Sequence, residues 1–305
     1  MKHARLGVVI SVVGALAMAA TAQAGNLRTW VANAGSDTST CGSPASPCKT
    51  LQQAVNLTAA GGEVDVLDPI QDFGATVSKA ITIDGGNFTH IQVSGTGVAG
   101  FYVNAGPNDV VAIRNLSINV LPAYPNDYAI TWYSGGTLEI ENVSISGGAG
   151  ISGSPSATGQ ITHFFAKDVI VRDATTGGVE LNGGGVSLPI NAVLDGVTVI
   201  NPLVGVTIAY GQALATHCSV VHASAWAFEA GPYSFFQVED STAAFSTYGM
   251  ASVGTGANLW IAGNNIENNS TGLYPLNNGQ LLSFGTNRLA GNDSDGVLSG
   301  TVTLK

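Results

Sequence analysis

The sequence predicts an all-β fold, a right-handed parallel β-helix in which short strands stack coil upon coil. Three observations predict it: a composition rich in glycine and poor in charge, a short apolar motif that recurs along the chain, and sparse hairpin signals between its copies. Of the 305 residues, 45% are hydrophobic, 10% are charged and 40 are glycine. This composition excludes an intrinsically disordered chain, which needs low hydrophobicity, and a coiled coil, which needs far more Glu, Lys and Arg.

The first predicted element is a secretory signal peptide over residues 1–24. A basic start precedes the apolar run Leu6–Met18, and residues 22–24 form an A-x-A cleavage site. The run is shorter than the about 20 residues that a transmembrane helix needs. We therefore expect export, to the periplasm or the extracellular space, of a single mature domain of residues 25–305.

The mature chain is strongly acidic. Removal of Lys2 and Arg5 leaves eight bases and all 20 acids, so the formal charge becomes 8 − 20 = −12. Such a surface disfavours polyanionic partners such as nucleic acid or polyuronates unless cations bridge the two. We expect neither a nucleic-acid partner nor a membrane partner for the mature form.

Residues 25–62 are predicted to cap the N-terminal end of the β-helix. After a short strand around Trp30, Cys41 and Cys48 delimit a Gly/Pro/Ser loop, and export favours a disulfide between them. A zinc site would need four ligands, and no further His or Cys lies near in the sequence. We expect Cys218 to be buried and inert; the alternative is a catalytic thiol, because His217 and His222 are close in sequence.

A short helix is predicted to follow the disulfide loop and to cover the open apolar end of the solenoid. Thr50 and Gln53 form a capping box at its start. Leu51, Ala54 and Val55 fall on one face, and Gly61-Gly62 is expected to end the helix. The first coils of the β-helix are then expected at residues 64–66 and 81–85.

Each copy of the repeat consists of an apolar residue, two mostly polar residues, and then an apolar, a polar and an apolar residue. Alternation of apolar and polar residues makes a short half-buried strand, and two outward residues in a row bend the chain. A single coil cannot bury its apolar inner face, but coils stacked on one another can. The predicted interior anchors are Leu116, Val143, Val169, Val197, Cys218, Ser241, Ile266 and Leu289. The residues one before them are predicted to form a column at a bend: Asn115, Asn142, Asp168, Gly196, His217, Asp240, Asn265 and Arg288. Two before the anchors, Arg114, Glu141, Lys167 and Asp195 alternate in sign and predict an external salt-bridge column.

The N-terminal third resembles the opening of secreted bacterial right-handed parallel β-helix repeat proteins, which are similar in fold to pectin lyases. The residues that carry the resemblance are Trp30-Val31, Gly35-Ser36-Asp37, Cys41, Pro47–Leu51, Ala54, Gly61–Val64, Leu67-Asp68-Pro69 and Lys79–Gly85. The resemblance implies the fold and export. It implies no particular reaction, because one fold hosts many functions.

Catalytic candidates are few. Pectin-degrading relatives pair acids with a basic residue on neighbouring coils. The nearest grouping here is Lys167 and Asp168 with Arg172 and Asp173, and Glu180 follows one strand on. A lyase would use Lys167 or Arg172 as base and the acids for calcium. The alternative is that these charges only form the salt-bridge column, since ion-pair networks imitate active sites.

Two further groups could act on sugars. Glu239 and Asp240 are adjacent carboxylates that could serve glycoside hydrolysis. The aromatic residues of an insertion predicted over Leu121–Gly135 could stack on a sugar ring; the alternative is that they pack the insertion against the solenoid. These aromatic residues are Tyr124, Tyr128, Trp132 and Tyr133.

The sequence thus predicts a secreted β-helix protein, first of all a non-catalytic structural or glycan-binding module. The alternative is a polysaccharide lyase or glycoside hydrolase of pectin-lyase-like fold. An extracellular or cell-envelope polysaccharide is the expected partner. No cofactor is expected, apart from Ca²⁺ if the chain is a lyase.

Overall fold

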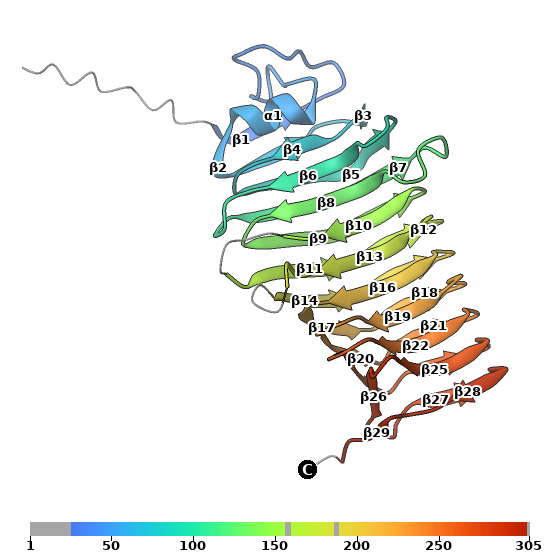
Figure 1. The fold of residues 1–305 in the computed structure, drawn as a ribbon. Coiled ribbons are helices and arrows are strands. Elements are labelled where there is room, and N and C mark those ends of the chain that lie inside the picture. Colours follow the sequence, from blue (N-terminus) through green and yellow to red (C-terminus); the bar gives the residue numbers. More distant parts are fainter. Residues whose placement is uncertain (1–25, 156–159, 186–188, 304–305) are drawn as a thin grey trace, which may run out of the picture.

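The structure is a computed structural model that describes residues 26–155, 160–185 and 189–303. It shows an all-β parallel β-helix, with one strand stacked on the next from the α1 end to the C-terminal end (Figure 1). Every pairing between the described strands is parallel, as the sequence predicts. The predicted signal peptide, residues 1–24, lies outside the described residues. No helix in the described part of the chain has the length and apolar character of a membrane span.

Each coil contributes strands to three faces. The first face contains β1 (Asn26–Val31), β2 (Thr58–Val66), β11 (Thr162–Lys167), β14 (Ile190–Asp195), β17 (Gly211–Thr216), β20 (Phe235–Glu239), β23 (Asn258–Ala262), β26 (Gln280–Ser283) and β29 (Gly300–Thr301). The second contains β3 (Ile70–Asp72), β12 (Ile170–Arg172), β15 (Thr198–Ile200), β18 (Ser219–Val221), β21 (Thr242–Ala244), β24 (Asn265–Glu267) and β27 (Arg288–Ala290). Three long strands run through both faces: β5 (Ile81–Val93), β7 (Val110–Val120) and β9 (Thr137–Ser146).

The third face is a separate sheet of ten strands. Its members are β4 (Ala75–Val77), β6 (Ala99–Asn104), β8 (Tyr128–Ser134), β10 (Ala149–Gly153), β13 (Gly177–Asn182), β16 (Val204–Ala209), β19 (Trp226–Ala230), β22 (Tyr248–Val253), β25 (Thr271–Leu276) and β28 (Ser294–Gly296).

The predicted interior stripe is confirmed. Leu116 pairs with Val143, and the same row continues through Val169 and Val197, all of which are buried. Corner residues with left-handed backbone precede this row, including Asn115, at a φ of 58°. Asn and Asp tolerate that conformation better than other non-glycine residues, which is why the polar residue one before each anchor makes the bend.

A row of small residues lies where each coil enters the third face. The row contains Gly100, Ala129, Gly150, Gly178, Gly205, Ala227, Gly249 and Gly272. A Cβ atom on Gly178 would lie 2.4 Å from Cγ1 of Val199, and one on Gly205 would lie 2.4 Å from Cγ1 of Val220. The glycine that precedes an apolar stretch in several coils is therefore required by close packing against the second face.

The predicted polar columns form in part. Asn142 donates to Asn115, and Asn115 donates to Asp84, so amides do stack at this corner. Glu141, Lys167 and Asp195 lie in register, with an ion pair of 3.9 Å between Glu141 and Lys167. The two end residues of the predicted salt-bridge column form ion pairs outside it: Arg114 with Glu63 and Asp84, and Asp195 with His217. Local partners on adjacent coils thus replace an unbroken column.

The last two predicted anchors are wrong by two residues. Asn264 and Asn287, not Ile266 and Leu289, continue the row of Ser241. Asn264 is 1% exposed, and its side chain accepts from the amide of Ser241 and donates to Asn287. A second ladder of the same kind runs through Ser246, Asn269 and Asn292. The interior of the last coils is therefore partly polar, and a pattern of apolar anchors does not identify it. The predicted corner residues Asn265 and Arg288 lie in strands.

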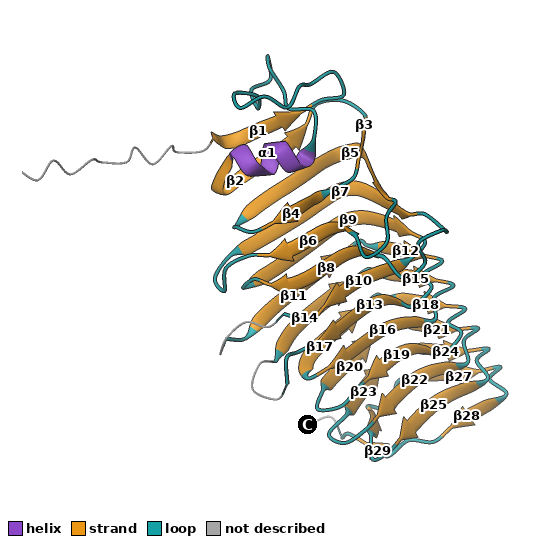
Figure 2. Cartoon of the chain, turned by 45° about the horizontal axis from the view of Figure 1, so that its top comes forward, coloured by secondary structure: helices purple, strands orange, loops and turns teal. Residues whose placement is uncertain are grey.

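Helix α1 (Leu51–Leu57) covers the N-terminal end of the β-helix (Figure 2). Its start is as predicted, because the Thr50 hydroxyl accepts from the amide of Gln53 and Leu51, Ala54 and Val55 are buried. Its predicted end at Gly61-Gly62 is wrong. The Thr58 hydroxyl and amide both donate to the carbonyl of Ala54 and end the helix earlier, so the two glycines belong to β2.

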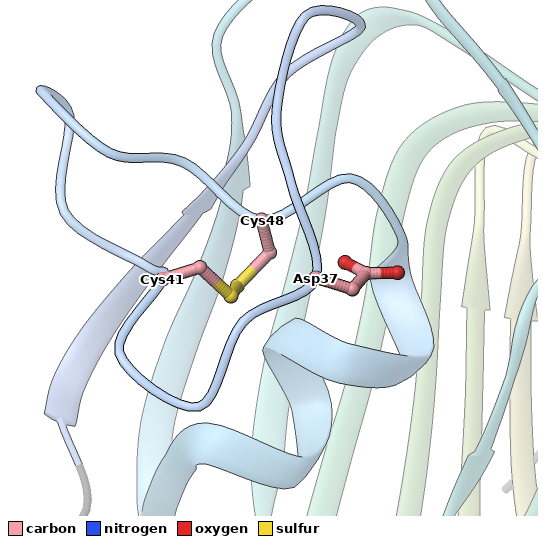
Figure 3. A group of neighbouring side chains, drawn as sticks. All are labelled: Asp37, Cys41 and Cys48. Atoms are coloured by element: carbon pink, nitrogen blue, oxygen red, sulfur yellow. A yellow bond between two sulfur atoms is a disulfide. The ribbon is translucent and has the colours of Figure 1, made fainter.

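The predicted disulfide between Cys41 and Cys48 is present, and Asp37 lies beside it (Figure 3). The Asp37 carboxylate accepts from the amides of Lys49 and Thr50 and from the Thr50 hydroxyl. The three side chains lie close enough to suggest a metal site, but both sulfur atoms are in the disulfide. Asp37 instead fixes the entry to α1, so the cluster is structural.

The insertion predicted over Leu121–Gly135 is shorter than expected. Only residues 121–127 form a loop, and Tyr128–Ser134 is the regular strand β8 of the third face. Alternation along β8 buries Trp132 completely, where it packs against Phe164 with 6.2 Å between the rings. The predicted role of Trp132 in stacking on a surface sugar is therefore wrong.

Candidate functional site

The outward surface of the third face carries a continuous row of side chains that we call the glutamate row. From one strand to the next the row contains Tyr102, Thr131, Ser152, Glu180, Thr207, Glu229, Ala251 and Tyr274. Inward residues such as Val179 and Leu181 flank the row and are buried in the core. Two carboxylates thus stand two strands apart on one surface, with a hydroxyl between them.

Local packing holds both carboxylates in place. The Glu180 side chain lies against Gly177: a Cβ atom at position 177 would lie only 2.1 Å from Cγ of Glu180. The hydroxyl of Thr207 donates to Oε2 of Glu229 at 3.0 Å. Glu180 and Glu229 are both partly buried. Two strand spacings put their Cα atoms about 9.6 Å apart. Inverting glycosidases hold their two carboxyl groups roughly 6.5–9.5 Å apart, a separation that side chains projecting from these two Cα positions can reach.

The two carboxyl groups have perturbed acidities. Burial raises the pKa of Glu180 above its usual range, and the negative charge of Glu229 raises it further. Burial also raises the pKa of Glu229, but the hydrogen bond from Thr207 opposes that rise. Both groups are therefore shifted toward the neutral form, but the causes differ: the charge of Glu229 adds to the shift of Glu180, whereas the hydrogen bond from Thr207 opposes the shift of Glu229. This asymmetry favours Glu180 as the acid and Glu229 as the base of the pair.

We expect Glu180→Gln to stabilise the fold at neutral pH. The pKa of Glu180 is higher in the folded protein than in the unfolded chain. Its contribution to stability is therefore complete at pH values below the unfolded-state pKa and is lost as the pH rises through the folded-state pKa. Glutamine does not titrate, so the variant should match the wild type near pH 4 and exceed it increasingly toward pH 7. Each unit of pKa shift corresponds to about 1.4 kcal/mol. Urea unfolding at several pH values measures this, with the exposed Glu141→Gln as control; equal stability of wild type and Glu180→Gln at pH 7 contradicts the expectation.

Aromatic side chains stand on both sides of the two glutamates. Toward the N-terminal end, Tyr102 stacks with Tyr133, which is 50% exposed, at 6.1 Å between ring centres. Toward the C-terminal end, Trp226, Tyr248 and Tyr274 form a continuous stack with spacings of 6.3 and 4.1 Å. Rings of this kind offer a flat apolar surface with a polar edge, which suits the faces and hydroxyls of sugars.

Two of the predicted sugar-stacking residues lie on this surface. Tyr128 and Tyr133 belong to β8, and burial together with the charge of Glu180 raises the pKa of Tyr128. Tyr124 lies in the preceding loop, where its backbone carbonyl accepts from the amide of Asp127. The sequence therefore locates part of the aromatic surface, although it misplaces Trp132.

The predicted catalytic residues Lys167, Asp168, Arg172 and Asp173 lie on other faces and corners. Lys167 ends β11 on the first face, and Arg172 ends β12 on the second. Asp168 and Asp173 occupy the corners on either side of β12, with left-handed backbone. Their catalytic role stays a prediction. Glu180 lies one strand on, as expected, in β13 of the third face.

The alternative pair Glu239 and Asp240 is also divided by a corner. Glu239 ends β20 and accepts from Gln237 at 2.6 Å, and Asp240 forms the bend with a φ of 47°. Cys218 is buried as expected, and burial raises the pKa of its thiol to about 11. A thiol with so high a pKa is a poor nucleophile at neutral pH.

The Glu180–Glu229 pair was not predicted from the sequence, although each residue has a local signal. Glu180 stands as the single charge within Val179-Glu-Leu181, and Glu229 within Phe228-Glu-Ala230. A charge between two inward residues must face outward on a strand. Aligning these two segments by coil, two repeats apart, would have placed both carboxylates in one row.

The comparison with solved structures agrees with the fold. No protein-family model matches the chain, and no curated protein matches it either. Two crystal structures of a GH136 lacto-N-biosidase from Eubacterium ramulus are similar in structure, one a selenomethionine derivative and one native. Each is 13% identical, covering 87% of this chain and 68% of the other, with TM-scores of 0.51 and 0.50. At this identity the likeness shows the fold alone.

Proposed function

We propose that the protein is a glycoside hydrolase, with Glu180 as general acid and Glu229 as general base on the outward surface of the third face. The observation that carries the proposal is the glutamate row, in which two partly buried carboxylates with raised pKa values stand two strands apart. A Cα spacing of about 9.6 Å allows the two carboxyl groups to stand far enough apart for a water molecule, as inversion at the anomeric carbon requires.

The roles follow from the surroundings. Protonated Glu180 gives its proton to the glycosidic oxygen as the bond from that oxygen to the anomeric carbon breaks. Glu229 takes a proton from a water molecule, whose oxygen bonds to the anomeric carbon from the opposite side. Both groups then exchange protons with solvent, which returns Glu180 to the acid form and Glu229 to the carboxylate. The hydroxyl of Thr207 donates to Oε2 of Glu229 and opposes the rise of its pKa, which favours the carboxylate form that a base needs.

Three considerations favour hydrolysis over the other functions expected from the sequence. The expectation of a non-catalytic module rested on the lack of a catalytic constellation, and the glutamate row supplies one. A lyase of the kind expected from the sequence uses Lys or Arg as its base, and the described members of the row include neither. Glycoside hydrolysis is also the activity named for the similar structures, so this fold can host it.

Export and independence from cofactors are part of the proposal. Disulfides persist in oxidising compartments, so the Cys41–Cys48 bond supports the predicted export. The two carboxyl groups supply both proton transfers, so the reaction as proposed calls for no cofactor. A polysaccharide or oligosaccharide is the proposed substrate, because aromatic rings extend along the axis of the β-helix on both sides of the pair.

The test is hydrolysis of a panel of neutral oligosaccharides that includes substrates of lacto-N-biosidases, with and without EDTA. We expect reducing ends to appear in both conditions, and NMR of the first product to show inversion at the anomeric carbon. The Glu180→Gln/Glu229→Gln double variant serves as the blank for contaminating enzymes. Unsaturated products that require calcium would instead establish a lyase, and equal turnover by the double variant would remove the glutamate row from the chemistry.

A further inference from the structure

The outward surface of the first face is hollowed in two neighbouring places. A hollow of about 340 Å³ extends from β9 to β14, and another of about 280 Å³ extends from β11 to β20. Both are lined by Phe165 and Val193. The two hollows therefore join into one groove, the first-face groove, which crosses the strands and follows the axis of the β-helix.

The floor of the first-face groove is apolar and exposed. Phe165, Val193 and Leu214 lie in register on three successive strands. Phe165 is 41% exposed and Val193 is 39% exposed. Farther along the axis Gln237 follows Leu214 in this row. Phe235, which is in register with Gln212, meets the ring of Trp260 edge to face at 4.9 Å between centres. Contiguous exposed apolar rows on a soluble protein commonly mark binding sites.

The two rims of the first-face groove are polar. One rim is the row of Glu141, Lys167 and Asp195, and the other is the row of His163, Asn191 and Gln212. Carboxylates accept hydrogen bonds, amides both accept and donate, and lysine donates. A ligand in the groove would thus meet apolar contacts below it and hydrogen-bonding groups on both sides.

We propose that the first-face groove binds an extended, uncharged polysaccharide chain, at a site separate from the glutamate row. A pyranose ring has an apolar face that can stack on Phe165 and hydroxyl groups at its edges that can reach both rims. Successive sugars along an extended chain repeat at a distance similar to the about 4.8 Å between coils, so each sugar meets an equivalent set of side chains. The glutamate row lies on a different sheet, so the groove would hold polymer without cleaving it.

The charges around the first-face groove and the pairing of the strands beneath it favour a neutral polysaccharide over an anionic glycan or a peptide. Glu139, Glu141 and Asp195 outnumber Lys167 around the groove, so an anionic glycan would be repelled. An extended peptide gains most of its affinity by adding a strand to an open sheet edge. The groove lies over the middle of a sheet whose strands already pair on both sides, for example β14 with β11 and β17.

The test is binding of neutral cello-, xylo- and mannohexaose, measured by calorimetry on the Glu180→Gln variant so that the ligand is not consumed. We expect at least one of these to bind, hexagalacturonate not to bind, Phe165→Ala to weaken binding about tenfold and Phe165→Tyr to retain it. Phe245→Ala, at an exposed ring on a corner outside the groove, is the control.

Three results would overturn the proposal. One is unchanged affinity in Phe165→Ala with folding intact, which would place the ligand elsewhere. Another is failure of all three neutral hexasaccharides to bind at millimolar concentration. The third is a dimer in sedimentation experiments that Phe165→Ala dissociates, since that would make the groove a contact between two copies of this chain.

Discussion

Replacing Asn264 with leucine is expected to lower the free energy of unfolding by about 3 kcal/mol. The leucine side chain has the same branched skeleton as asparagine and is not smaller, so the change removes hydrogen bonds without opening a cavity. The amide of Ser241 loses its acceptor and the carbonyl of Val238 loses a donor, both inside the β-helix. A buried polar group without a partner costs about 1–3 kcal/mol, and two such groups account for the expected loss.

The neighbouring residue provides a matched control. Asn265 is exposed on β24, so Asn265→Leu should change stability by no more than about 0.5 kcal/mol. Urea unfolding of the two variants measures both effects. The pair also discriminates between two registers of the last coils, because a register anchored on Ile266 puts the corner column at Asn265. A larger loss for Asn265→Leu than for Asn264→Leu would contradict the ladder.

The repeat was readable from the sequence wherever the interior is apolar. Leu116, Val143, Val169 and Val197 are large enough to define the inward direction, and the residue before each makes the corner. From Cys218 onward the interior row shrinks and then becomes polar, through Ser241 to Asn264. Sequence periodicity identifies hydrophobic positions, and it has no means of distinguishing a buried amide in a ladder from an exposed one.

The candidate site was harder to predict for a related reason. Lys167, Asp168, Arg172 and Asp173 are close in sequence, and this closeness suggested a site. A solenoid separates sequence neighbours onto different faces and brings together residues about one coil apart. Glu180 and Glu229 meet only because two intervening coil lengths place them in the same row. Coil lengths vary with the loops, so the row becomes visible only when the strand register is known.

The largest effect on activity is expected from the two glutamates, and leaving-group chemistry can separate their roles. Glu180→Gln should reduce kcat/KM by about 10²–10⁴-fold on natural glycosides, the usual size of a general acid–base contribution. The same variant should lose much less on aryl glycosides with acidic phenol leaving groups, because such phenolates depart without a proton. Glu229→Gln should lose activity on both classes, because activation of water is needed in each.

Thr207→Val provides an independent check on this division of roles. The variant removes the hydroxyl that donates to Oε2 of Glu229, so the pKa of Glu229 should rise and the base should be protonated at higher pH. The acidic limb of the pH–rate profile should therefore move to higher pH, while the preference between leaving groups stays as in the wild type. Glu267→Gln, on β24 of the second face, is the matched control and should leave rates within about twofold, a difference below about 0.5 kcal/mol. Equal losses on both substrate classes for Glu180→Gln, or an unmoved acidic limb for Thr207→Val, would show that the acid and base are not assigned to these residues as proposed.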